Sequence, residues 1–188
     1  MRLSRNTWVS LLAMVLVAAM YRAIPNRPWG FAPQFAIAIF GGAILSNKKW
    51  AFVLTLSSML LSDFFYQLLY QNGISEIPGI YDGILLNYAI FASLTVIGFF
   101  VNPSNLSSIV KGAIASPTIF FILSNFITWL GNGGYQRPKT FSGLMQAYAD
   151  GIPFYGNSLV ATFVFGAILF GSHHFIMKSK SAIQVFSK

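Results

Sequence analysis

Four polar residues inside long apolar segments have side chains that can hold a small molecule. They are Asp63, Asn87, Asn125 and Asn157. Placing polar groups in hydrocarbon is costly, so polar residues within apolar segments mark candidate functional sites. Each lies three to seven residues from one end of its segment, and threading through a bilayer places these ends near one face. The carboxylate would supply charge or a hydrogen-bond acceptor, and the amides would supply directional hydrogen bonds.

We predict that these polar groups and nearby aromatic residues form an outward-facing pocket. Its aromatic walls would hold a flat, largely apolar ligand, which the carboxylate and the amides would orient. The predicted pocket residues are Trp29, Asp63, Asn125, Trp129, Tyr148 and Asn157. Each feature also has a structural interpretation, because asparagines join membrane helices and aromatic residues collect at membrane interfaces. For Asp63 that alternative is a salt bridge to Arg22 or a protonated, hydrogen-bonded acid in the core.

The common catalytic and metal-binding motifs are missing from this sequence. There is no cysteine, so thiolate chemistry, disulfides and cysteine-ligated metals are excluded. His173 and His174 are neighbours, and adjacent helix positions point about 100° apart, which makes a poor metal site. The sequence has no HExxH, GxSxG or P-loop motif, and Asp63 is the one carboxylate expected at depth. We therefore expect a protein that is not an enzyme, with no catalytic residues, no metal and no cofactor.

The composition indicates a single integral membrane domain covering residues 1–188. The chain is 55% hydrophobic and 9% charged, whereas soluble domains carry roughly 25% charged residues. A chain of 188 residues has too little interior to bury 19 Phe, 8 Tyr and 4 Trp, so the lipid bilayer must be its solvent. The net charge of +8 comes largely from basic residues at the ends of apolar segments, so nucleic acid is not an expected partner.

An all-α, polytopic fold with about six transmembrane helices follows from apolar runs close to the roughly 20 residues that a span needs. The predicted spans are Thr7 to Tyr21, Ala32 to Leu45, Trp50 to Tyr70, Ile84 to Val101, Ser107 to Leu130 and Phe154 to Met177. The basic start and first run resemble a signal peptide. The weak cleavage candidate Val17-Ala18-Ala19 lies inside the run, so we interpret it as a retained span. Pro117 is expected to kink the fifth span, and Pro153 to occupy the start of the sixth.

The distribution of lysine and arginine predicts that both termini face the cytoplasm. The eight inner basic residues are then Arg2, Arg5, Lys48, Lys49, Lys111, Lys178, Lys180 and Lys188, and the four outer ones are Arg22, Arg27, Arg137 and Lys139. The outer loops, residues 22–31, 71–83 and 131–153, are longer than the inner ones, which is typical of loops that carry function. In the third loop, an apolar spacing predicts a short amphipathic helix on the membrane surface, formed by Phe141, Leu144, Met145 and Tyr148.

The second predicted span is rich in small residues. It contains the pairs Ala32/Ala36 and Ala38/Gly42, each four positions apart. Small residues at this spacing let two helices approach closely. We expect these pairs to pack within the monomer, and a face that docks a partner is the alternative.

Several stretches resemble an uncharacterised family of small bacterial multi-pass membrane proteins. The resemblance covers roughly residues 25 to 170 and rests on Phe31-Ala-Pro-Gln-Phe-Ala-Ile-Ala-Ile-Phe-Gly-Gly-Ala43, Leu61-Ser-Asp63, Leu123-Ser-Asn-Phe-Ile-Thr-Trp129, Pro138-Lys-Thr-Phe-Ser-Gly-Leu144 and Gly151-Ile-Pro-Phe-Tyr-Gly-Asn157. That family is similar in turn to the S components, the substrate-binding subunits of energy-coupling-factor vitamin transporters. The similarity implies a bundle of six helices and ligand contacts on the outer loops and outer helix ends. It also implies docking onto a transmembrane coupling subunit that is driven by ATPases.

Two positions depart from this resemblance. The Ala-xxx-Ala docking motif of S components is absent from the first span, where the alanines are Ala13, Ala18 and Ala19. Thr162 stands near the position where the bacterial family has an acidic residue. A charged partner for Asp63 or for a ligand is therefore not expected from the last span.

Together these observations predict the substrate-binding subunit of a small-molecule importer in the inner (plasma) membrane of a bacterium. It would bind a vitamin-like ligand from outside, and separate ATPase subunits would supply the energy, because the sequence has no nucleotide-binding motif. The alternative is a non-transporting accessory or assembly subunit of a larger membrane complex. An outer cavity connected to solvent favours the first function, and a solidly packed outer half favours the second.

Overall fold

A computed structural model describes residues 13, 15–17, 20, 21, 24, 28–131 and 133–186, with side chains through residue 175. The described part is all-helical, as predicted, and contains no strand. Its labelled helices are α2 (Gln34–Ile44), α3 (Lys48–Gln71), α4 (Ile84–Gly98), α5 (Leu106–Leu130) and α6 (Phe141–Phe186). Most of the first predicted span, Thr7 to Tyr21, lies outside the described residues.

Three of the described helices are long and apolar enough to cross a membrane. They are Lys48–Gln71, Leu106–Leu130 and the Phe141–Phe175 part of α6. The predicted boundaries of the second to fifth spans agree with α2 to α5 within about three residues. Asn47 and Asn105 start α3 and α5, because each side chain accepts a hydrogen bond from a backbone N–H of the first turn. The count of six spans and the orientation of the termini stay predictions.

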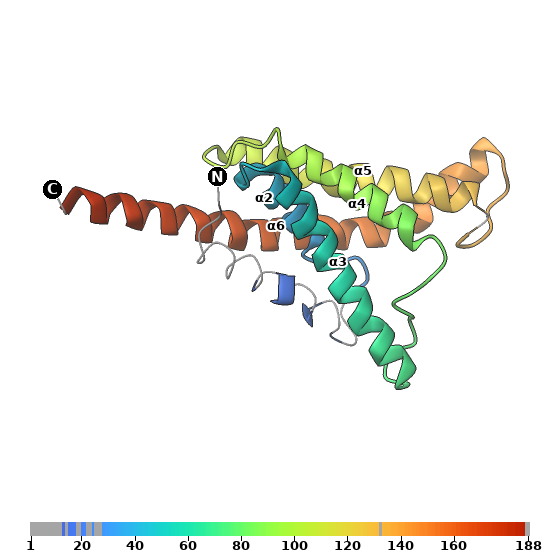
Figure 1. Cartoon of the computed structure of the whole chain (residues 1–188). Helices are drawn as coiled ribbons and strands as arrows, with labels where there is room; N and C mark the ends of the chain where they lie inside the picture. Colours follow the sequence, from blue (N-terminus) through green and yellow to red (C-terminus); the bar gives the residue numbers. More distant parts are fainter. Residues whose placement is uncertain are drawn as a thin grey trace.

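The sixth span differs from its prediction, because α6 begins at Phe141 and contains Pro153 in its interior. The helix predicted at Phe141 to Tyr148 is present, but it forms the first turns of α6 and is not a separate element, so the connection is shorter than the expected residues 131–153. The expected first-turn position of Pro153 is wrong. Proline removes one helical N–H, and a membrane helix tolerates this loss when neighbouring groups satisfy the backbone. At 1.5 Å per residue, the 46 residues of α6 span roughly 70 Å, well beyond a hydrocarbon core of about 30 Å. Its C-terminal part extends past the other helices (Figure 1).

The short helix α2 lies at the centre of the bundle and contacts α3, α4, α5 and α6. Every residue from Gln34 to Gly42 is buried. A side chain at Gly42 would collide with the backbone of Thr95, and one at Gly98 with the carbonyl of Ile39. The backbones of α2 and α4 are therefore in direct contact, which confirms that the small residues of this helix pack within the monomer.

The bundle is asymmetric around α2. α4 and α5 lie along one side of α6, whereas α3 leaves the bundle towards its C-terminal end (Figure 1). The rings of Phe35, Phe91 and Phe120 join α2, α4 and α5, with centroids 5.0 to 5.2 Å apart. Large apolar side chains such as Leu60, Phe64 and Leu85 are exposed, as expected for surfaces that face lipid.

Candidate ligand cavity

A cavity of about 220 Å³ lies between α5 and α6. It is formed by two facing stripes with helical spacing, one on each helix. The residues that line it are Pro117, Phe120, Phe121, Ser124 and Asn125 of α5 and Gly151, Phe154, Tyr155 and Ser158 of α6. Six of these nine lining residues are aromatic residues, glycine or proline, which have few side-chain rotamers. The walls of the cavity are therefore rigid and largely apolar.

Specific contacts between α5 and α6 border the cavity. The hydroxyls of Thr118 and Tyr155 are 2.8 Å apart and hydrogen bonded. The Asn125 amide lies directly against Gly151, where the position of an added Cβ would be 2.5 Å from Oδ1. The rings of Phe121 and Tyr155 are 4.8 Å apart. Pro117 has no N–H, so the carbonyl of Ala113 has no helical donor at this point of α5.

Besides Tyr155, whose hydroxyl bonds to Thr118, three residues with polar side chains line the cavity, and none of the lining residues in the described chain is charged. Asn125 donates from Nδ2 to the carbonyl of Phe121 at 2.8 Å. Within the described residues its Oδ1 receives no hydrogen bond. The Ser158 hydroxyl lies 2.9 Å from the Phe154 carbonyl and 3.0 Å from the Gly30 carbonyl. The remaining polar group is the hydroxyl of Ser124.

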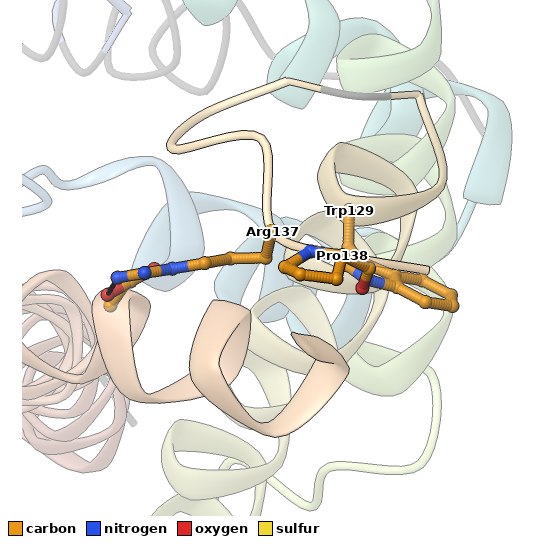
Figure 2. Close-up of polar contacts among 4 residues, drawn as sticks. Trp129, Arg137 and Pro138 are labelled. Atoms are coloured by element: carbon orange, nitrogen blue, oxygen red, sulfur yellow. Dashed lines mark hydrogen bonds and ion pairs between the residues drawn. The ribbon is translucent and has the colours of Figure 1, made fainter. Parts of the chain in front are cut away.

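The loop of residues 131–140 connects α5 to α6 and is fastened to both helices. We call this loop with its fastening contacts the clasp. Trp129 of α5 donates from Nε1 to the carbonyl of Pro138 at 2.8 Å. Arg137 forms two hydrogen bonds to Asp150 of α6, at 2.8 and 2.9 Å. Figure 2 shows the side chains of Arg137 and Trp129 on opposite sides of the loop. The hydrogen bonds to Asp150 raise the pKa of the Arg137 guanidinium above its ordinary value, so the arginine stays charged.

Two further contacts fix the clasp in its position. The carbonyl of Pro138 lies directly over Gly143, where a side chain would collide with it. Lys139 places its Nζ 4.9 Å from the centre of the Trp129 ring, a cation–π contact. Because Asp150 precedes Gly151 in α6, the clasp lies next to the end of the cavity that Asn125 borders.

Residues 28–31 cover another side of α6 next to the cavity. Asn157 donates from Nδ2 to the carbonyl of Trp29 at 2.8 Å, and the Trp29 ring meets Phe154 edge-on at 6.4 Å. Gly30 has a φ of +79°, which favours glycine, and a Cβ there would be 2.5 Å from the Phe154 carbonyl. This loop therefore packs directly against two residues that line the cavity.

Asp63 lies in a separate polar region between α3 and α4. Its side chain is 4% exposed, and the Tyr88 hydroxyl donates to its Oδ2 at 2.8 Å. Gly79 of the loop after α3 sits on the backbone of Asp63, and Gln67 fastens this loop by accepting the N–H groups of Gly79 and Ile80. The alternative of a salt bridge to Arg22 concerns a residue outside the described part of the chain.

The predicted pocket residues thus fall into five places. Asn125 lines the cavity, while Trp129 belongs to the clasp. Tyr148 joins α6 to α5 by a hydrogen bond to the Ile122 carbonyl at 3.3 Å. Trp29 and Asn157 bond to each other beside the cavity, and Asp63 is not among the lining residues. The ligand contacts predicted for these residues stay predictions.

The sequence prediction of aromatic walls did not name the aromatic residues that line this cavity. Phe120, Phe121, Phe154 and Tyr155 are the walls of the cavity, but Phe is so abundant in this chain that single positions do not stand out. A signal was present in the α5 stripe, where Pro117 and Asn125 are eight residues apart and share one helix face. The facing small residue Gly151 completes the pattern.

The described helices, of which three have the length and composition of membrane spans, define an all-helical chain that fits a membrane protein. A family model, described as a family of unknown function (DUF6580), matches residues 2–184. The chain therefore belongs to this family. No curated protein and no solved structure matches it.

Proposed function

We propose that this protein is the substrate-binding subunit of a small-molecule importer in the bacterial inner (plasma) membrane. The observation that carries the proposal is the cavity between α5 and α6, which combines aromatic walls with the free acceptor of Asn125. Binding sites for small molecules are typically concave and mostly apolar, with a few polar groups that fix the orientation of the ligand. The positive-inside bias supports a six-span topology in which this cavity opens to the outside.

The energy for import would come from other subunits. The sequence has no nucleotide-binding motif, and its resemblance to S components supports docking onto a transmembrane coupling subunit with cytoplasmic ATPases. This role requires only that the present chain bind its cargo and release it inside. No step of bond-making or bond-breaking chemistry is assigned to it.

A second candidate function is that of a non-transporting accessory or assembly subunit of a larger membrane complex. One observation favours it: Trp29, Trp129, Tyr148 and Asn157 all bond to backbone carbonyls of this same chain or accept such bonds. Residues with these contacts stabilise the fold whether or not a ligand binds. The two functions differ in whether the α5–α6 cavity is occupied in the cell.

The test is native mass spectrometry of the protein purified in mild detergent. We expect one small metabolite bound at a stoichiometry of one, and loss of that metabolite from Asn125→Leu. The matched control is Asn87→Leu, because Asn87 is also a helix asparagine but bonds to Tyr81 outside the cavity. Lipids alone, or stable copurification with other membrane proteins, would support the accessory function instead.

A further inference from the structure

We infer that the cavity takes an uncharged aromatic molecule of one ring or two fused rings that carries a hydrogen-bond donor, such as a phenol or an indole. The inference rests on the proposed function and names its class of ligand. It follows from the size of the cavity, its walls, its lack of charge and the Oδ1 of Asn125, which accepts no hydrogen bond from a described residue.

The size of the cavity limits the ligand to a small molecule. An apolar cavity of about 150 Å³ inside a protein accommodates benzene, whereas drug-sized ligands occupy about 300 to 1,000 Å³. The present cavity, at about 220 Å³, lies between these limits. It has room for a substituted ring or a fused bicycle, but not for a nucleotide or a long flexible chain.

The walls favour a flat ring over an aliphatic chain. Phe120 and Phe121 of α5 line the cavity together with Phe154 and Tyr155 of α6, and the rings of Phe121 and Tyr155 are in contact with each other. Aromatic side chains prefer offset or edge-to-face contacts with ring centroids about 4.5 to 7 Å apart, and the Phe121–Tyr155 and Trp29–Phe154 pairs already have such contacts. An aromatic ligand can continue this pattern on both helices.

The absence of charge from the lining favours a neutral ligand over an ionic one. None of the nine lining residues in the described chain is Asp, Glu, Lys, Arg or His. Transferring an isolated ion into surroundings without a counter-ion is far more costly than transferring a neutral polar group. Asp63, which the sequence suggested as a partner for a ligand cation, is not among the lining residues.

The polar group of the ligand is assigned by Asn125. Its Nδ2 is used by the Phe121 carbonyl, while no described residue donates to its Oδ1. An acceptor in an apolar cavity gains most from a ligand that donates a hydrogen bond. A phenol O–H or an indole N–H meets this requirement without adding charge.

The experiment follows binding of 4-fluorophenol to the purified full-length protein in detergent by fluorine NMR. Partition of 4-fluorophenol into detergent micelles is the same for every variant, so a difference in binding between variants reports on the cavity. We expect one saturable site, which phenol and indole compete for and which benzoate and benzylammonium do not. Asn125→Leu should weaken binding about tenfold, as expected for the loss of one hydrogen bond in an apolar site.

A second pair of variants keeps the test informative if Asn125→Leu does not fold. Ser124→Phe places a ring in the cavity and should abolish binding. Ile119→Phe, on the exposed face of the same helix, should leave binding unchanged. Equal binding to these two variants would place the probe elsewhere and overturn the inference.

The outcomes also separate this inference from the proposed function. Competition by benzoate or benzylammonium equal to that by phenol would overturn the neutral class of ligand, while the cavity would remain a binding site. Absence of saturable 4-fluorophenol binding would overturn the aromatic class of ligand. In that case, a metabolite of another class that mass spectrometry finds in the native protein and not in Asn125→Leu would still support a binding subunit. Failure of both experiments would overturn both proposals.

Discussion

The buried amide of Gln34 gives a prediction about stability that follows directly from the packing around α2. Gln34 is the first residue of α2 and is 1% exposed. Neither its Oε1 nor its Nε2 has a hydrogen-bond partner within the described structure. A buried polar group without a partner costs about 1 to 3 kcal/mol of stability. Gln34→Met keeps an unbranched side chain of similar size and good helix propensity but removes both polar atoms.

We therefore expect Gln34→Met to stabilise the protein by about 1 to 3 kcal/mol. For a chain of 150 to 250 residues, each kcal/mol shifts the midpoint of thermal unfolding by roughly 2 to 4 °C. The midpoint should thus rise by roughly 2 to 12 °C, measured in detergent by the fluorescence of the four tryptophans.

Thr55→Val is the matched control, because it also exchanges a buried polar group for an apolar one of the same shape. The Thr55 hydroxyl donates to the Ala51 carbonyl and accepts from Thr95, both at 3.1 Å. Its loss should lower stability by about 1 kcal/mol. A fall for Gln34→Met as large as that for Thr55→Val would refute the reasoning, since it would mean that the Gln34 amide has a bound partner such as an ordered water.

Three further predictions concern the clasp, the helix packing and Asp63. The chain has no cysteine, so Asn125→Cys provides a single thiol in the cavity for a membrane-impermeant maleimide. This thiol should react several times faster when Asp150→Asn removes the ion pair that holds the clasp. An unchanged rate would show that the clasp does not control access to the cavity. Gly98→Ala should lower stability by about 1 to 3 kcal/mol in thermal unfolding, because the added Cβ collides with the backbone of α2. The control is Gly156→Ala, because Gly156 has open space around it. Equal effects of the two substitutions would contradict this account. Asp63→Asn should leave 4-fluorophenol binding unchanged, because Asp63 does not line the cavity, whereas loss of binding in a folded protein would restore its predicted role as a ligand residue.

The sequence predicted the helices whose ends carry clear local signals. The predicted spans agree with α3 and α5 within two residues at each end, because both helices are long apolar runs, and the side chains of Asn47 and Asn105 cap their first turns. The sequence predicts two separate helices where the structure has α6, because Pro153 suits the first turn of a helix. The residues before it, such as Leu144, Met145 and Ala147, are good helix formers, and they continue the helix through the proline.

The sequence predicts a depth for each polar residue of the candidate site but not its place around the bundle. Asp63 and Asn125 were expected at one level, yet Asp63 bonds to Tyr88 of α4 while Asn125 faces Gly151 of α6. Depth follows from distance along each segment, whereas the neighbours of a helix depend on how all helices pack around α2. A single sequence shows which residues lie at the same distance along their helices. It does not show which of these residues line the same cavity, because that depends on how the helices pack.

The most direct test is an experimental structure of the protein purified without removal of endogenous small molecules. We predict density for one flat molecule between α5 and α6, within hydrogen-bond distance of Asn125 Oδ1 and absent from Asn125→Leu. Side chains that fill this space in the purified protein, or a small molecule bound beside Asp63 with the α5–α6 cavity empty, would contradict the account.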